Sequence, residues 1–434
     1  MSLQQIVDIH CHFINFDYLP DKYTIHLVRN KLGDMADMFD EEDFKNPQIF
    51  LKFLLKMAGF LGTKYLDEFL RSMKQLDFEN NPQVIDTLVN EGEYFLPQDM
   101  KAKYQKGRKG KLILFTPLMM DFIKAANMPT PTTSEGVIPF KQQLKEHVLF
   151  SKRYPWKIFP FFHYHPERKG VYKMFVDAIE KYGFIGVKLY PAMGFYPDCT
   201  HSKNDPAVNK RLKKLYDYIA TQKYDYRIPI TAHSQNSSTQ AIDLTMPQTW
   251  EFTRISNWKK MIETYGLKIN FAHYGGKEFS IPGYTEEKEF SKECRKTIHT
   301  LMAKYNKDGN KQIFADTSAH SKKRYRYFKQ LNIDLNNPQR LIMFGTDLPV
   351  ITGSTLNRDY INSFFNKIQG EDNKDRFFKR HAFDFLFEDG NIPSNYIDFL
   401  ERNRQDPAIL ADPFAPENIP DFLTKSANGN YTVV

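Results

Sequence analysis

The sequence has few cysteines and no long apolar run. It contains 3 cysteines among 434 residues, and the spacing of Cys11, Cys199 and Cys294 indicates no disulfide framework, which is typical of a protein in a reducing cytoplasm. No stretch of about 18 apolar residues is present, so we expect no transmembrane helix. A strand-like segment begins within about the first dozen residues, so we expect no cleaved secretory leader. These absences predict a cytoplasmic protein without a membrane partner.

The chain also lacks a long block of charge of one sign. The formal net charge is +8, but basic residues are interleaved with acidic ones, which is more typical of a solvated surface than of a nucleic-acid site. Hydrophobic residues make up 41% and aromatic residues 15%, which is enough for a packed core. A chain of this length fits one large α/β barrel with an appendage, or about two to three ordinary domains. We expect a small molecule as its partner, and no nucleic acid.

Two histidines stand one residue apart in the first strand-like segment, Val7-Asp8-Ile9-His10-Cys11-His12. Side chains of a β-strand alternate between its faces, so His10 and His12 share one face and Cys11 lies on the other. Neutral imidazole is a common protein ligand of Zn²⁺, so this pair predicts two ligands of one ion. The alternative is a chance pair of histidines on an edge strand.

Eight short apolar runs recur along the chain, and amphipathic segments separate them. This alternation predicts parallel strands with helical crossovers, an α/β fold, and eight strands predict a (β/α)₈ TIM barrel with its active site at the C-terminal ends of the strands. The predicted strands are 5–12, 111–119, 157–165, 184–190, 228–233, 267–273, 312–318 and 340–347. The predicted helices include 171–182, 207–222, 250–265, 291–305, 359–368 and 375–386.

Two segments fall outside this alternation. Residues 13–109 have helical periodicity without a credible strand, which predicts a large helical insertion after the first strand, near the mouth of the active site. The insertion either shapes the site or only buries aromatic side chains. Residues 403–434 are predicted to form a C-terminal tail, and residues 1–12 and 110–402 the barrel itself.

Four later strands end in a side chain that can bind a metal or an anion: Lys188, His233, His273 and Asp347. The C-terminal ends of barrel strands face one bowl, so these groups are expected to converge with His10 although they are far apart in sequence. A catalytic zinc site needs about three protein donors and an open position. Each residue alone is weak evidence, because a single histidine at a strand end is more often a satisfied core residue.

The motifs VDIHCH, GVKLYPAMGFYPD, IPITAHS, INFAHYGG and IMFGTDLP, in this order, resemble the amidohydrolase superfamily. The nearest branch is the amidohydrolase-2 group of metal-dependent TIM-barrel hydrolases, which includes relatives of aminocarboxymuconate semialdehyde decarboxylase. The resemblance covers roughly residues 5–12 and 111–350, and leaves out the insertion and the tail.

This resemblance implies a set of site residues. His10, His12 and Asp347 would bind the metal, with His233 as a further ligand, and Asp347 would also relay a proton. His273 would either bind a second ion or orient and activate the attacking water, so Asp347 and His273 are the candidate catalytic residues. The implied ion is Zn²⁺, with another divalent transition metal as the alternative.

Lys188 decides the number of metal ions that the resemblance implies. A carbamylated lysine at the end of the fourth strand bridges two ions in binuclear relatives. With a single ion, Lys188 would instead be a buried ammonium or a clamp for a substrate carboxylate. We favour one ion over two.

Other polar groups are candidates for contact with the substrate. His163 and His165 alternate on the third predicted strand with Arg168 beyond them, and Tyr190 follows Lys188. A purely structural role is the alternative for the histidine pair. Weaker candidates for shaping the pocket are Asp198 and Asp316, and Asp8 is expected to support the metal ligands from behind. We expect packing or surface roles for the remaining histidines: His201, His299, His320 and His381.

Three functions are compatible with these residues. The first is a metal-dependent hydrolase that cleaves a C–N or C–O bond of a small carboxylated substrate with a metal-activated water. The second is a metal-dependent decarboxylase on the same scaffold. The third is a barrel in which the metal is only structural. The resemblance also allows a homo-oligomer.

Overall fold

A computed structural model describes residues 3–13, 82–92, 101–121, 134–221, 223–235, 241, 244–276, 285–320, 325–348, 357–426 and 429–434. Most of the predicted insertion, residues 14–81 and 93–100, lies outside the described residues. Its described part contains α5, Pro82–Glu91, and α6, Lys101–Lys106. Every helix among the described residues is too short or too polar to cross a lipid bilayer.

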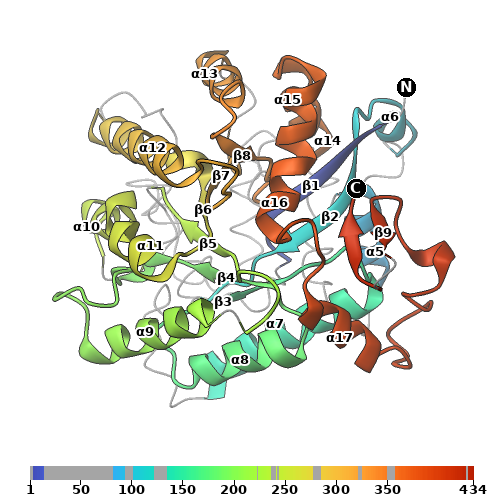
Figure 1. Cartoon of the computed structure of the whole chain (residues 1–434), viewed down its shortest axis with the longest axis horizontal. Helices are drawn as coiled ribbons and strands as arrows, with labels where there is room; N and C mark the ends of the chain where they lie inside the picture. Colours follow the sequence, from blue (N-terminus) through green and yellow to red (C-terminus); the bar gives the residue numbers. More distant parts are fainter. Residues whose placement is uncertain are drawn as a thin grey trace, which may run out of the picture.

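Six parallel strands form the central sheet, in the order β3-β4-β5-β6-β7-β8 (Figure 1). Every residue in them is buried, which is typical of parallel strands covered on both faces. Together with the surrounding helices they confirm the predicted α/β class. The strands are β3, Phe161–His163; β4, Gly186–Leu189; β5, Ile230–His233; β6, Ile269–Ala272; β7, Ile313–Asp316; and β8, Leu341–Met343.

The first two strands, β1, Gln4–Cys11, and β2, Gly110–Pro117, form a parallel pair. Backbone hydrogen bonds join this pair to both edges of the central sheet. The N–H of Ile9 donates to the carbonyl of Phe344 (3.3 Å), and the N–H of Met119 donates to the carbonyl of Phe161 (3.1 Å). Isolated parallel bridges at Cys11–Leu348 and Leu118–Phe161 follow the same lines. These contacts place β1 beside β8 and β2 beside β3.

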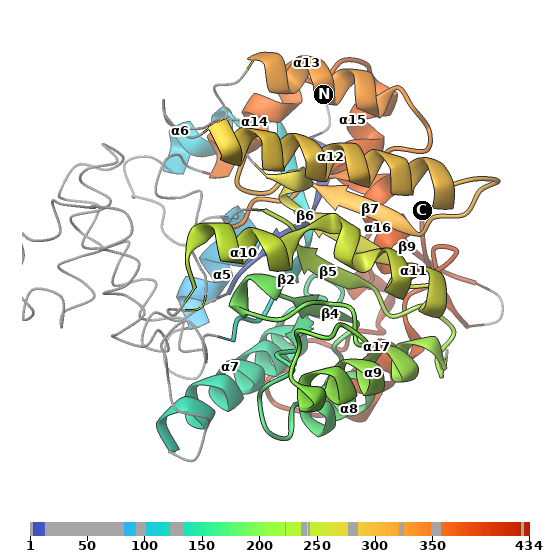
Figure 2. The ribbon, with the colours of Figure 1, turned by 90° about the vertical axis from the view of Figure 1, so that its left-hand side faces the viewer.

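Helices surround the strands (Figures 1 and 2). Their inward faces carry apolar residues at helical spacing, as in α8, where Val171, Phe175 and Ala178 are buried. The helices between strands are α7, Ser134–Arg153; α8, Val171–Lys181; α9, Pro206–Ala220; α10, Met246–Thr253; α11, Lys259–Tyr265; α12, Thr285–Tyr305; and α13, Tyr325–Leu335. After β8 come α14, Asn357–Lys367; α15, Glu371–Asp375; the π-helix Arg376–Arg380; α16, His381–Leu386; and α17, Ser394–Arg402.

The helix predicted over 250–265 is not continuous. It is divided into α10, the 3₁₀ helix Ile255–Trp258 and α11. The break falls at Arg254, whose backbone (φ −55°, ψ 130°) is outside the helical region. Apolar spacing alone did not reveal the break, because the apolar positions continue on both sides of it.

The tail after residue 402 is more ordered than a plain extended segment. It contains the 3₁₀ helix Pro416–Asn418 and an antiparallel pair, β9, Leu423–Lys425, and β10, Tyr431–Val433. The indole N–H of Trp156 donates to the carbonyl of Pro413 (2.8 Å), and Tyr431 is buried against the Trp156 ring. The tail therefore packs onto the segment that precedes β3.

Candidate metal centre

His10 and His12 lie at the C-terminal end of β1, and hydrogen bonds fix the orientation of both rings. Nδ1 of His12 is 2.8 Å from the carbonyl of Leu118, which can only accept, so Nδ1 carries the proton. Nδ1 of His10 is 3.0 Å from the Asp316 carboxylate, which gives the same tautomer. Each neutral ring therefore presents an unprotonated Nε2, the state that binds a metal.

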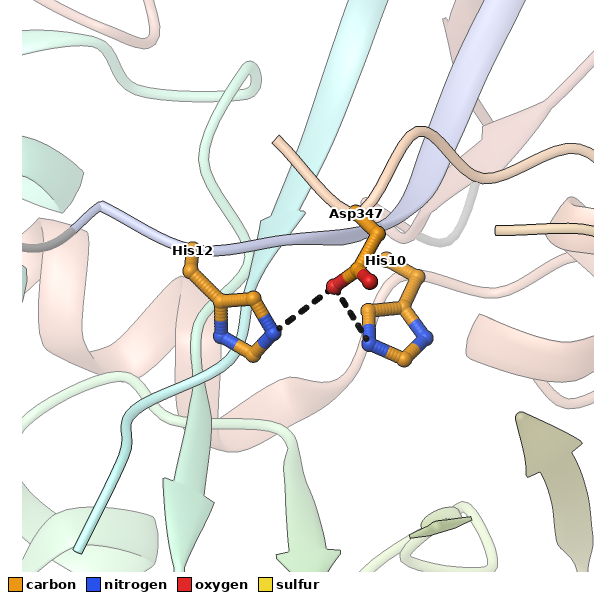
Figure 3. A group of neighbouring side chains, drawn as sticks. All are labelled: His10, His12 and Asp347. Atoms are coloured by element: carbon orange, nitrogen blue, oxygen red, sulfur yellow. Dashed lines mark ion pairs between the residues drawn. The ribbon is translucent and has the colours of Figure 1, made fainter. Parts of the chain in front are cut away.

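Asp347 faces both of these nitrogens (Figure 3). Its Oδ1 lies 3.3 Å from Nε2 of His12 and 3.5 Å from Nε2 of His10. The ligand atoms of the three residues all lie within 4.8 Å of one another, and all three side chains are buried. Asp347 has a positive φ of 60°, a strained backbone for a residue with a side chain, of the kind that is concentrated at functional sites.

Three atoms that can bind a metal ion thus lie close together. With its proton on Nδ1, the His10 imidazole has no proton on Nε2 to donate to the Asp347 oxygen. Nε2 of His10 is buried and has no hydrogen-bond partner among the described residues. Burial also lowers the pKa of His10, so a second proton on this ring is disfavoured. Two imidazole nitrogens and a carboxylate oxygen in this arrangement are the donor set of a divalent cation such as Zn²⁺, and the residues fit such an ion.

Asp8 lies behind His10 and Asp347 and bonds the backbone beside both of them. Its carboxylate accepts hydrogen bonds from the hydroxyl of Thr346 (2.6 Å), the N–H of Thr346 (3.0 Å) and the N–H of His10 (3.2 Å). Burial raises the pKa of Asp8 to about 7 despite these bonds. Asp8 therefore joins the backbone that carries His10 to the backbone that carries Asp347.

Asp316, at the end of β7, is the most connected carboxylate at this site. Oδ2 accepts from Nδ1 of His10 (3.0 Å) and from the side-chain amide of Asn270 (2.7 Å). Oδ1 accepts from the N–H groups of His273 (3.1 Å) and Ser318 (3.0 Å) and from the Ser318 hydroxyl. Burial raises the pKa of Asp316, but its interactions with His10, His273 and Ser318 outweigh burial and hold the pKa well below its usual value. The sequence suggested only that Asp316 shapes the pocket, whereas the structure shows that it orients His10.

A chain of hydrogen bonds also fixes His273 and His233. The hydroxyl of Ser318 donates to Asp316, so its oxygen accepts the proton on Nδ1 of His273 (2.9 Å). Nε2 of His273 then accepts from Nδ1 of His233 (3.1 Å). Nε2 of His233 is left with a free electron pair, and it is buried without a hydrogen-bond partner among the described residues. His233 belongs to neither group of ligand atoms that lie within 4.8 Å of one another among the described residues, and both nitrogens of His273 are used within the protein.

The atoms of His10, His273 and Asp316 also lie within 4.8 Å of one another and form a second candidate group. The Ser318 hydroxyl lies among them, 3.1 Å from Nδ1 of His10 and 2.9 Å from Nδ1 of His273. Both of these nitrogens carry protons in the network described above. Hydrogen bonds therefore account for this second group without a cation.

Lys188 lies on β4, and its ammonium nitrogen is buried without a hydrogen-bond partner among the described residues. It lies 5.6 Å from the centre of the Tyr190 ring, which in turn stacks on His233 at 4.1 Å. Burial lowers the pKa of Lys188 to about 8, although the carboxylates of Asp316 and Asp347 oppose this shift. An unpartnered buried amine is costly, which favours a partner that binds from outside the chain.

His163 is the register neighbour of Lys188 on β3. The backbone N–H of Asp121 donates to Nδ1 of His163 (3.0 Å), so the proton of the neutral ring is on Nε2. The Met119 carbonyl lies 3.2 Å from the same Nδ1, but the N–H of Asp121 can only donate, and this decides the tautomer. Nε2 of His163 is buried without a hydrogen-bond partner among the described residues, so it can donate to a bound molecule.

Arg168 forms a buried ion pair that the sequence did not predict. Its guanidinium donates to both oxygens of Asp121, at 2.5 and 2.7 Å, and lies 4.3 Å from the centre of the Phe140 ring. Burial raises the pKa of Asp121, but these contacts outweigh burial and lower the pKa to about 2. The predicted substrate-binding residue Arg168 is thus held by Asp121, 47 residues earlier. His165 accepts from the N–H of Glu167 (3.2 Å) and packs on Phe195.

Of the four histidines expected to have packing or surface roles, His320 is joined directly to the site. Its Nε2 lies 2.8 Å from the carbonyl of His273, to which it donates. His381 has the expected packing role, because it is buried with Nδ1 2.9 Å from the carbonyl of Ile342. His201 stacks on Tyr196, and the carboxylate of Asp198 accepts from Thr200 in the same loop. His299 contacts Tyr274.

No protein-family model and no curated protein matches the chain. Several solved structures do. The 2,6-dihydroxybenzoate decarboxylase from Rhizobium matches with 11% identity and a TM-score of 0.46, over 90% of this chain and 100% of that one. The 5-carboxyvanillate decarboxylase from Novosphingobium aromaticivorans, solved with manganese, matches with 10% identity and a TM-score of 0.46, over 89% and 96%. An amidohydrolase from Burkholderia ambifaria with bound zinc matches with 11% identity and a TM-score of 0.40, over 89% and 87%. The chain is similar to decarboxylases and amidohydrolases.

Proposed function

We propose that the chain is a metal-dependent hydrolase of the amidohydrolase superfamily, which cleaves a C–N or C–O bond of a small carboxylated substrate. The observation that carries this proposal is the convergence of Nε2 of His10, Nε2 of His12 and Oδ1 of Asp347, with the protons of both rings held on the far nitrogens. A divalent cation bound there supplies a Lewis acid that makes water a nucleophile at neutral pH.

In this proposal one ion is held by His10, His12 and Asp347, with His233 as the further ligand. His273 positions His233, because its Nε2 accepts the proton on Nδ1 of that ring. This assignment favours one ion over two, since neither nitrogen of His273 is left to bind a second. Asp347 is also the proposed group that takes up and returns a proton, because its carboxylate faces the other ligands.

The substrate carboxylate is proposed to lie between Lys188 and His163. These two side chains are neighbours on adjacent strands, and each has a buried terminal nitrogen without a hydrogen-bond partner among the described residues. An ammonium and an imidazole N–H are both donors, and a carboxylate accepts from both. Tyr190 lies between Lys188 and His233 and would form a wall of the same pocket. In the alternative, Lys188 is carbamylated and bridges two ions.

The proposed architecture is a closed (β/α)₈ barrel made from residues 1–12 and 110–402, with 13–109 as an insertion near its mouth and 403–434 as a C-terminal tail. The hydrogen bonds from β1 to the segment after β8, and from the end of β2 to β3, support closure. Closure would place the C-terminal end of β1 and the C-terminal ends of β4, β5, β6, β7 and β8 around one site.

The test separates hydrolysis from decarboxylation, which the same scaffold could perform. Protein loaded with Zn²⁺ or Mn²⁺ is assayed against lactones, amides and aromatic acids in water enriched in ¹⁸O. Hydrolysis predicts one labelled oxygen in the product and no carbon dioxide. Carbon dioxide release without label in the product would replace the proposal with the decarboxylase.

Lys188→Met tests the number of metal ions in the same preparation. We expect one ion per chain in both proteins and a raised KM for carboxylated substrates in the variant, because Lys188 would contact the substrate and not the metal. A fall from two ions to one or none would establish the bridging lysine instead.

A further inference from the structure

A basic pocket lies on the outside of the strands, between α12 and α13, which run next to each other in both views (Figures 1 and 2). It has a volume of about 640 Å³. Five of its lining residues carry basic side chains: Lys292, Arg295, Lys296, His299 and Arg340. No carboxylate belongs to the described residues that line it.

The nearby acidic groups offset only part of this charge. Asp334 is buried and lies 3.7 Å from both Nη1 of Arg340 and Nε2 of His299, and it also accepts from the Tyr274 hydroxyl (2.6 Å). One carboxylate is thus shared among several donors. Glu289 lies 2.7 Å from the exposed Lys292, and such surface pairs are weak in water. A partly sheltered concavity with an excess of one charge attracts ions of the opposite charge.

The pocket is connected to the metal centre through Tyr274. Arg295 is 5% exposed, its Nε donates to the Tyr274 carbonyl (3.4 Å), and its guanidinium lies 4.9 Å from the centre of the Tyr274 ring. His299 lies 2.5 Å from the Tyr274 hydroxyl. Tyr274 directly follows His273, and both have positive φ angles, 46° and 61°. Two pocket residues therefore hold a strained turn that also carries a residue of the candidate site.

We propose that this pocket binds a small molecule with two or more negative charges, of the phosphate-ester type, and that the bound anion is sensed at His273 through Tyr274. The volume admits a molecule larger than a single phosphate. An anion bound beside Arg340 and His299 competes with Asp334 for these two side chains, and this changes how firmly His299 holds Tyr274. Binding of the anion does not depend on the proposed function, because none of the residues that line the pocket belongs to the candidate metal centre.

The binding test is calorimetric titration of the full chain with fructose 1,6-bisphosphate at fixed ionic strength, with fructose as the uncharged control. The variant Lys292→Gln/Lys296→Gln removes two exposed charges from the pocket. The matched control is Lys210→Gln/Lys214→Gln, an exposed pair with the same spacing on α9. We expect binding of one molecule per chain, weakened about tenfold in the pocket variant and unchanged in the control. Equal affinities in all three proteins, or no saturable binding, would overturn the proposal.

The connection to His273 is tested by amide hydrogen exchange, which needs no enzymatic activity. We expect fructose 1,6-bisphosphate to change exchange in a peptide covering 272–276, and we expect this change to be lost in Tyr274→Phe, which keeps the ring but removes the hydroxyl. Binding without any change of exchange in this peptide would refute the connection. A change that persists in Tyr274→Phe would also refute it, since the hydroxyl is the proposed contact.

Discussion

Replacing Asp316 by Asn is the most informative single change, because the two side chains have the same shape and differ only in charge and in one donor. Both carboxylate oxygens of Asp316 accept hydrogen bonds. Oδ2 accepts from His10 and Asn270, and Oδ1 accepts from the backbone of His273 and from Ser318. Whichever way the new amide is turned, its NH₂ group faces at least two donors.

The expected loss follows from these contacts. Hydrogen bonds to charged groups contribute about 1.5 to 3 kcal/mol each, so two lost bonds lower the free energy of unfolding of the metal-free protein by about 3 to 6 kcal/mol. His10 would also lose the partner that keeps its proton on Nδ1. Removing such a partner of a metal-binding histidine weakens metal affinity by about 10- to 100-fold.

The measurements are urea unfolding in the presence of EDTA and competition for Zn²⁺ with a chromophoric chelator. The control is Asp384→Asn, which removes a partly exposed pair with Lys311 and should change stability by less than about 1 kcal/mol. If Asp316→Asn bound zinc as tightly as the unchanged protein, the tautomer argument for His10 would be wrong.

Two further predictions concern packing and acid stability. A Cβ added to Gly345 would lie 2.9 Å from Cβ of His10. Gly345→Ala should therefore displace His10 and weaken zinc binding about tenfold in the chelator assay. The control Gly309→Ala, whose added Cβ meets no atom within 4 Å, should leave zinc binding unchanged. Asp121, with its pKa lowered from 3.8 to about 2, should stabilise the fold by about 2 kcal/mol above pH 4 and lose this as the pH falls from about 4 towards 2. Urea unfolding against pH should show this loss relative to Asp121→Asn, and parallel curves for the two proteins would contradict it.

The sequence predicted the strands well, because buried parallel strands are continuous apolar runs. Each of the eight runs overlaps a strand of the structure, although most strands are shorter than predicted; the run over 157–165, for instance, becomes Phe161–His163. The break at Arg254 could not be predicted from apolar spacing. The proposed insertion lies mostly outside the described residues, so it stays a prediction.

The structure adds residues that no spacing rule could select. His10 and Asp347 were chosen as candidates because strand-end histidines and a terminal aspartate stand out in a sequence, and the structure places them close together. Asp316 was undervalued, since one aspartate at a strand end does not reveal how many donors surround it. Asp121 was missed because its buried partner Arg168 comes 47 residues later. The roles of His163 and Lys188 in substrate binding stay predictions.

The central claim is that two imidazoles of β1 and one carboxylate hold a cation. Metal content per chain, measured by elemental analysis after zinc loading and gel filtration, tests it directly in the unchanged protein, in His12→Phe and in the control His201→Phe. We predict one zinc ion per chain in the unchanged protein and in the control, and little or none in His12→Phe. No bound metal in the unchanged protein, or equal retention in His12→Phe, would contradict the account.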